Sequence, residues 1–330
     1  MNTLQIDKIN LGLIVISFTL ACLLPFELFL VSYAVLGPLH YLTETNWIAD
    51  KNYFVPNTLW KYVVLVSAII YTTPYLFSLT IFRELLNDST LTFLTITIRQ
   101  YTNGVLFFVL VSAVLSLVIS SYKAFMYSFI LVLIISFFTH TSPTYGLIFG
   151  ILLPTIIHVF VFTVLFMVYG LKKATNWIGV LNVVLMFLLP LSLWFINTDV
   201  FHYEFSQTIK NNYLQNNFHV LNAHLAKLLG AYDELKFFFY EKVDLKIQIF
   251  IAFAYLYHYL NWFSKTTVIG WHKKLTKKKS VIILGVWLLV LASYLYDYRV
   301  GIICSVFLSV IHVMFEFPLN VITVKTLVKK

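Results

Sequence analysis

Long apolar runs separated by short polar stretches dominate the sequence. A helix needs about 20 mainly apolar residues to cross the hydrocarbon core of a bilayer, and runs of this kind recur along the whole chain. They predict about ten spanning helices. The expected cores are 10–24, 26–46, 58–82, 102–121, 123–139, 146–171, 175–196, 246–264, 279–296 and 300–323. The predicted fold class is therefore all-α, a polytopic integral membrane helical bundle.

Two stretches depart from this pattern. Segment 83–101 places two arginines and two acids around a moderately apolar run, which predicts an interfacial or re-entrant piece. The connection 197–245 carries mixed charge, and helical spacing of its apolar residues predicts one or two amphipathic helices on the outer surface. No repeat or low-complexity tract divides the chain, so we expect residues 1–330 to form a single membrane domain.

Composition agrees with a membrane protein. The 330 residues are 60% hydrophobic and only 11% charged, whereas a soluble domain carries roughly 25% charged residues. Too few polar side chains remain to cover a water-soluble globule. The net charge of +9 does not indicate nucleic-acid binding, because the lysines cluster in short loops between apolar segments. Cys22 and Cys304 lie within apolar segments and are expected to be small buried hydrophobes.

The lysines also predict an orientation. The segment from Lys265 to Lys279 holds six lysines and no acid, which places it in the cytoplasm by the positive-inside rule. Counting outward puts nine more lysines on the same side: Lys8, Lys51, Lys61, Lys123, Lys172, Lys173, Lys325, Lys329 and Lys330. We therefore expect both termini to be cytoplasmic and loop 197–245 to lie outside. The expected location is a bacterial inner (plasma) membrane.

Four histidines lie inside the predicted spans: His40, His158, His258 and His312. An imidazole is costly in a membrane interior, so such residues face the bundle interior and usually serve a function. On the predicted topology all four helices run from outside to inside and carry their histidine at a similar depth. Four imidazoles in one layer predict a shared metal site.

Two glutamates accompany these histidines. Glu44 follows His40 and Glu316 follows His312 at a spacing that puts both side chains on one helical face. Each glutamate is a candidate metal ligand, an acceptor that orients a histidine, or a proton carrier in catalysis. Neutral imidazole suits Zn, Fe, Cu and Ni, and a histidine-rich shell with an open position suits non-haem Fe(II) and oxygen chemistry. Zinc hydrolysis also fits. The expected cofactor is Fe(II), with Zn or another transition metal as the alternative.

Three functional interpretations follow. The leading one is an intramembrane metalloenzyme, an oxidoreductase acting on a lipid-soluble molecule such as a carotenoid, isoprenoid or acyl chain, in contact with membrane lipids and without nucleic acid. In the second, the same residues relay protons or pass metal ions in a transporter. In the third, a lipid or polysaccharide transferase has its site in loop 197–245. A lone membrane histidine that only hydrogen-bonds to a neighbouring helix is the structural alternative.

The stretch from Gly37 to Glu44, GPLHYLTE, places a proline just before His40 and an acid four residues after it. It resembles the GxPHGxxD-like stretch of the Brp/Blh family of membrane β-carotene 15,15′-dioxygenases. The resemblance implies a polytopic helical fold, iron held by intramembrane histidines, here His40, and cleavage of β-carotene to retinal. Tyr41 stands where that family has glycine, and Glu44 where it has aspartate.

Overall fold

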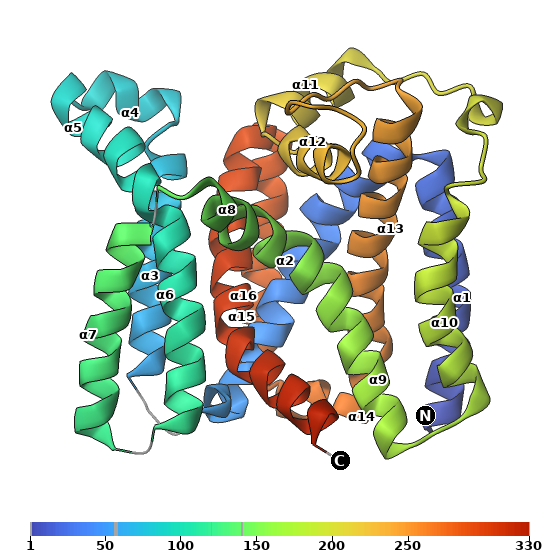
Figure 1. The fold of residues 1–330 in the computed structure, drawn as a ribbon, viewed down its shortest axis with the longest axis horizontal. Coiled ribbons are helices and arrows are strands. Elements are labelled where there is room, and N and C mark those ends of the chain that lie inside the picture. The colour runs from blue at the N-terminus through green and yellow to red at the C-terminus, as the bar shows by residue number, and fades with distance from the viewer. Residues whose placement is uncertain (1, 56–58, 120, 140, 330) are drawn as a thin grey trace. The chain divides into compact units, whose positions relative to one another are not determined.

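A computed structural model describes residues 2–55, 59–119, 121–139 and 141–329. Every regular element within these ranges is a helix, which confirms the predicted all-α class (Figure 1). Among the described residues, six helical segments are long and apolar enough to cross a membrane: Thr3–Leu23, Pro25–Asp50, Asp88–Val118, Pro143–Lys173, Lys277–Tyr296 and Tyr298–Val328. The chain therefore has the helices of a membrane protein. The count of about ten spans and the sidedness of the termini stay predictions.

Each predicted span overlaps at least one helix of the described residues, although 58–82 extends beyond α3 into α4 (Thr80–Leu85). The helices are α1 (Thr3–Leu23), α2 (Pro25–Asp50), α3 (Trp60–Leu76), α6 (Ile98–Val118), α7 (Tyr122–Thr139), α10 (Trp177–Ser192), α13 (Lys242–Ser264), α15 (Lys277–Tyr296) and α16 (Tyr298–Val328). The remaining span consists of α8 (Pro143–Tyr145), the π-helix η3 (Gly146–Phe162) and α9 (Thr163–Lys173). Helix α2 begins at Pro25, a position where a missing N–H costs nothing. It continues unbroken through Pro38.

Contacts group the chain into two compact units, while the predicted single membrane domain stays a prediction. The first unit comprises residues 1–40 and 156–279. In it, α1 packs against α13 and α10. Most residues of α13 are buried, so this helix forms the centre of the unit. Helix α2 supplies residues 25–40 to this unit, with His40 as its last residue there.

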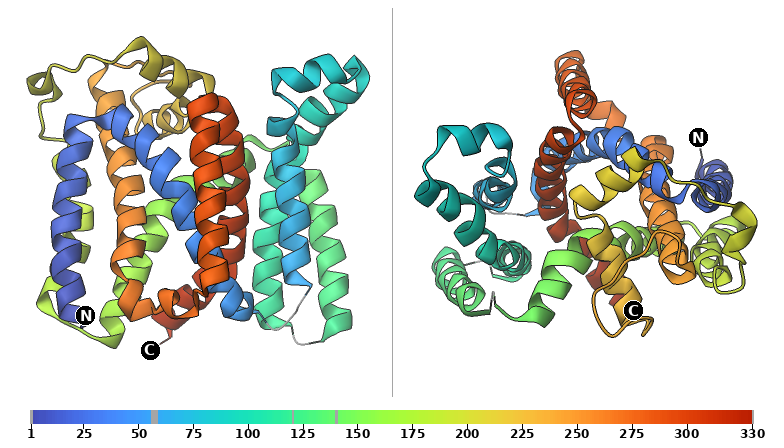
Figure 2. Two further views of the ribbon diagram at one scale, coloured as in Figure 1. Left: turned by 180° about the vertical axis from the view of Figure 1, so that it is seen from behind. Right: turned by 90° about the horizontal axis from the view of Figure 1, so that it is seen from above.

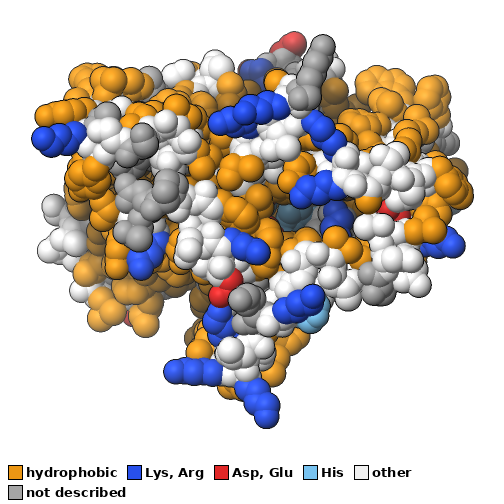
Figure 3. Space-filling view, turned by 90° about the horizontal axis from the view of Figure 1, so that it is seen from below, with side chains coloured by type: hydrophobic (Ala, Val, Ile, Leu, Met, Phe, Trp, Pro, Cys, Tyr) orange, Lys and Arg blue, Asp and Glu red, His pale blue; other side chains and the backbone are white. Residues whose placement is uncertain are grey.

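The lysine-bearing ends of the first unit lie together. The start of α1, the end of α9 and the end of α13 are at the same end of the unit (Figure 2). They carry Lys8, Lys172, Lys173 and Lys265. A space-filling view from this end shows many basic and few acidic side chains (Figure 3). This arrangement is what the positive-inside rule requires of these lysines.

Segment 197–245, named the outer connection after the side on which it is predicted to lie, contains helices, as expected. It contains η4 (Thr198–Phe201), α11 (Gln207–Gln215) and α12 (His219–Leu228), which lie across one end of α13 (Figure 1). Buried hydrogen bonds fix them there. The Asn222 amide donates to the Asp244 carbonyl oxygen at 2.9 Å, and the Tyr213 hydroxyl donates to Gln248 Oε1 at 2.6 Å. The Gln248 amide in turn donates to the Pro25 carbonyl oxygen, so the connection is tied to the helices below it.

The second unit comprises residues 41–155 and 280–330. Helices α3, α6 and α7 run side by side in it, and α16 packs against α3 and α6 (Figure 2). The charged stretch 83–101 forms the end of α4 (Thr80–Leu85), α5 (Asp88–Thr92), the π-helical turn η2 (Phe93–Thr97) and the start of α6. Because η2 leads directly into α6, the helical segment begins earlier than the predicted core at 102.

Gly301 lies where α16 approaches α15 closely. A Cβ atom at this position would come within 2.3 to 2.7 Å of three ring atoms of Tyr294. Gly285, on α15, has no heavy atom within 4 Å of its equivalent position. We expect Gly301→Ala to lower the free energy of unfolding by about 1–3 kcal/mol through overpacking. Gly285→Ala should instead be neutral or raise it by up to about 1 kcal/mol.

Thermal unfolding of both variants in detergent measures this difference. Equal effects of the two substitutions would contradict the close approach of α15 and α16.

Candidate metal centre

His40 and His258 face each other in the first unit. Helix α2 carries His40 and α13 carries His258, and both side chains are buried. Their Nε2 atoms are 3.0 Å apart. Two nitrogens that bind one metal at about 2.0–2.1 Å lie about 2.8–3.4 Å apart for bond angles of about 90–109°. The pair therefore has the spacing of two ligands of a common ion. Without an ion, one imidazole donates to the other.

The opposite side of the His258 ring contacts Thr163, the first residue of α9. The Thr163 hydroxyl oxygen lies 2.8 Å from His258 Nδ1. The same oxygen donates to the Val159 carbonyl oxygen at 2.7 Å. Both ring nitrogens of His258 are thus held, one by a hydroxyl and one by a second imidazole.

His158 joins this group from η3. It is buried, and its ring centroid lies 5.1 Å from that of His258 in an edge-on arrangement. A run of π-helix is rare and frequently marks a functional position. Pro154, one turn earlier in η3, has no N–H to offer the helix. Three of the four predicted metal-binding histidines therefore lie together in the first unit.

The fourth histidine lies with both predicted glutamates in the second unit. His312 Nε2 is 3.6 Å from Glu316 Oε2, and His312 Nδ1 is 4.0 Å from Glu44 Oε2. All three side chains are buried. The ring of Tyr41 stacks on that of His312, with centroids 5.3 Å apart. The imidazole thus has a carboxyl group near each ring nitrogen, at separations longer than a hydrogen bond.

Among the described residues, buried histidine and glutamate side chains could contribute to a metal site: His40, His158, His258, His312 and Glu316. Their donor atoms do not select one metal, because imidazole serves several divalent ions. That His312 binds the same ion as the other three stays a prediction, as do the catalytic roles of Glu44 and Glu316.

The sequence did not indicate Thr163. It is one of many hydroxyl residues in the predicted spans, and its contact with His258 joins residues 95 positions apart. The sequence singles out Tyr41 only as a departure from the family motif. Consecutive residues on a helix point in different directions. The Tyr41 side chain therefore points in another direction than that of His40, and it stacks on His312.

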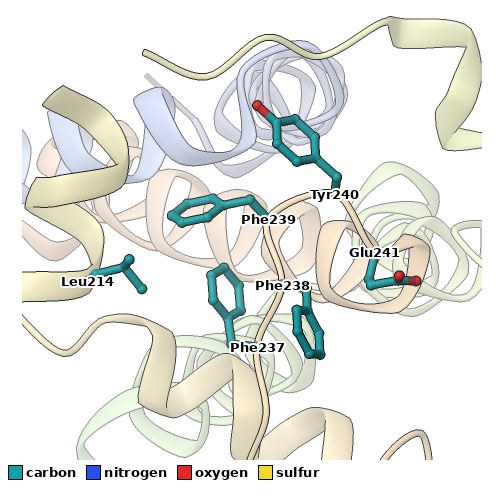
Figure 4. Close-up of a pocket in the computed structure, with 6 residues that line it drawn as sticks. All are labelled: Leu214, Phe237, Phe238, Phe239, Tyr240 and Glu241. Atoms are coloured by element: carbon teal, nitrogen blue, oxygen red, sulfur yellow. The ribbon is translucent and has the colours of Figure 1, made fainter. Parts of the chain in front are cut away.

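The outer connection contains a pocket of about 360 Å³. It is lined by Leu214, Phe237, Phe238, Phe239, Tyr240 and Glu241 (Figure 4). Leu214 of α11 faces Phe237 and Phe239 from the other side of the pocket (Figure 4). The lining is mainly aromatic, and Glu241 is its only charged side chain. These residues offer an apolar surface with little to polarise or attack a transferred group.

Beside this pocket, Asp244 anchors the aromatic segment. Its Oδ2 accepts a hydrogen bond from the Tyr232 hydroxyl at 2.9 Å and another from the Phe238 backbone N–H at 2.8 Å. The side chain is fully buried at the start of α13, before the predicted span 246–264. Burial raises the pKa of the Asp244 carboxyl above its ordinary value, and the two donated hydrogen bonds oppose this shift.

Comparisons of the chain with models of protein families, with curated proteins and with solved structures find no match. The resemblance of residues 37–44 to the Brp/Blh family therefore stays an expectation.

The raised pKa of Asp244 predicts a pH dependence of stability. The folded state holds the Asp244 proton more tightly than the unfolded state does. Its stabilising contribution is therefore complete below the unfolded pKa and is lost as pH rises through the folded pKa. The melting temperature of the wild type, relative to Asp244→Asn, should rise as pH falls from about 8 to about 4.

Thermal unfolding of both proteins in the same detergent over this range tests the sign. A difference that falls with acidification would mean that the hydrogen bonds to the carboxylate outweigh its burial.

Proposed function

We propose that this protein is an intramembrane metalloenzyme, an oxidoreductase with a histidine-bound metal. The observation that carries the proposal is the 3.0 Å separation of two buried Nε2 atoms, those of His40 and His258. An imidazole–imidazole hydrogen bond has the same spacing, and a third buried imidazole beside the pair favours a metal site over that structural alternative. His158, whose ring contacts His258, is the third proposed ligand. Iron(II) is the proposed metal, since histidine ligands with open positions suit it.

The surroundings of His40 favour an apolar substrate. The rings of Tyr259, Trp262 and Phe263 lie with centroids 5.3, 5.8 and 6.4 Å from that of His40. Such walls exclude water and pack against hydrocarbon. We propose a carotenoid, isoprenoid or acyl chain that enters from the lipid, with β-carotene as the specific case implied by the Gly37–Glu44 resemblance. Bound iron would supply binding and activation of oxygen.

Glu44 and Glu316 are proposed to carry protons beside His312. An imidazole with a carboxyl near each nitrogen can accept a proton on one side and release one from the other. These groups come from α2 and α16, and each is almost completely buried. A buried acid that exchanges protons with histidine is a suitable catalytic group because no water competes with it.

Metal content is the first test. The purified wild type should hold about one iron or zinc ion per chain, as a centre with three protein ligands does. His40→Ala and His258→Ala should lose most of it. His219→Ala, in α12 of the outer connection, is the matched control and should retain the wild-type amount.

A folded wild type that binds neither iron nor zinc, even after reconstitution with each, would falsify the proposal. The variant His312→Ala decides in the same assay whether the fourth predicted histidine is a ligand.

The proposed proton carriers are tested by turnover. In micelles containing β-carotene, the iron-loaded protein should consume oxygen and cleave the substrate. Glu316→Gln should keep its metal yet lower the rate constant by about 10²–10⁴-fold, the range typical of general acid–base catalysis. A variant with full metal and full turnover would remove Glu316 from the mechanism.

A proton-coupled transporter is the second candidate. The Glu44–His312–Glu316 group favours it, because two carboxyls and an imidazole in an apolar bundle are the components of a proton relay. In proteoliposomes this candidate predicts proton or metal-ion flux that is lost in His312→Ala. Metal-dependent oxygen consumption without flux would support the enzyme instead.

A further inference from the structure

Thr163 contacts His258, a proposed metal ligand, at the ring nitrogen that does not face His40. We infer that the Thr163 hydroxyl fixes the tautomer of His258 so that its Nε2 carries no proton and can bind the metal. Thr163 is thus a positioning residue that acts through His258. The inference rests on the proposed metal site for its function, although the tautomer itself can be observed without metal.

The Thr163 hydroxyl has a single proton to donate. The oxygen lies 2.7 Å from the Val159 carbonyl oxygen and 2.8 Å from His258 Nδ1. A hydroxyl has one proton to donate and two lone pairs that accept. A carbonyl oxygen can only accept, so the proton of Thr163 must point to Val159. The contact with His258 then requires an N–H on Nδ1.

The opposite assignment is unfavourable. If Thr163 donated to His258 Nδ1, its oxygen and the carbonyl oxygen of Val159 would face each other at 2.7 Å without a proton between them. Both are buried, with Thr163 only 2% exposed, so water does not relieve the repulsion. Buried polar groups that lack a partner cost about 1–3 kcal/mol. The first assignment satisfies both contacts.

The proton on Nδ1 of His258 also determines the state of Nε2, on the other side of the ring. A neutral imidazole has one N–H, so a proton on Nδ1 leaves Nε2 of His258 with a free lone pair. That lone pair faces His40 Nε2 at 3.0 Å. Histidines that bind metals commonly donate their second ring N–H to an oxygen, which fixes the tautomer and ring orientation. Thr163 supplies that oxygen here.

Three variants separate this role from packing. Thr163→Val keeps the shape and removes the acceptor, whereas Thr163→Ser keeps the hydroxyl. Thr155→Val is the matched control, because Thr155 lies on the same helical segment and its hydroxyl also bonds to the carbonyl four residues earlier. Zinc affinity is measured by competition with a chromophoric chelator. The tautomer of His258 is read from the ¹⁵N spectrum of histidine-labelled, metal-free protein, with His258→Gln to assign the signal.

We expect Thr163→Val to weaken zinc binding by about 10–100-fold, while Thr163→Ser and Thr155→Val change it by less than about 3-fold. In the metal-free wild type, the ¹⁵N signals of His258 should show the proton on Nδ1, and Thr163→Val should shift the tautomer. A proton on Nε2 in the wild type, or equal zinc affinity in Thr163→Val, overturns the inference.

The two readouts distinguish the failures. A wild type that binds no zinc or iron, yet carries its His258 proton on Nδ1, contradicts the proposed function and leaves the tautomer assignment standing. A wild type that binds metal while its His258 proton lies on Nε2 keeps the proposed function and rejects the role of Thr163.

Discussion

A buried imidazole must satisfy two ring nitrogens without help from water, and His258 meets this constraint from two directions. Thr163 holds Nδ1 and His40 faces Nε2. These contacts bring α2, the start of α9 and α13 to one place in the first unit. Unsatisfied polar groups are costly in an apolar interior. The positions of these helices and the tautomer of His258 therefore depend on each other.

The same principle operates differently in the second unit. There His312 has a carboxyl group near each nitrogen and a tyrosine ring stacked on its face. The neighbours of the ring nitrogens are thus the carboxyl groups of Glu44 and Glu316, whereas in the first unit they are a neutral hydroxyl and an imidazole. The two environments suit different tasks: an imidazole held by a neutral oxygen suits metal binding, and an imidazole beside two carboxyl groups suits proton transfer.

Much of this could be predicted from the sequence because membranes impose strong rules. Apolar runs of sufficient length located the helices, and the cost of a buried imidazole singled out His40, His158 and His258 before their contacts were known. The i, i+4 spacing correctly placed Glu316 beside His312. The Thr163 contact could not be predicted, since it depends on the rotation of two helices about their own axes. The sequence also did not predict the earlier start of the segment leading into α6 or the π-helical form of η3. Local apolarity does not distinguish these backbone forms.

X-ray absorption at the metal edge of iron-loaded protein tests the central claim most directly. The spectrum reports the atoms bound to the metal and their distances, whatever the substrate or the reaction. We predict nitrogen ligands at about 2.0–2.2 Å with the outer-shell pattern of at least two imidazoles, and a loss of that pattern in His258→Ala. A metal surrounded only by oxygen ligands, with the same spectrum in His258→Ala, would contradict a histidine-bound centre in this membrane bundle.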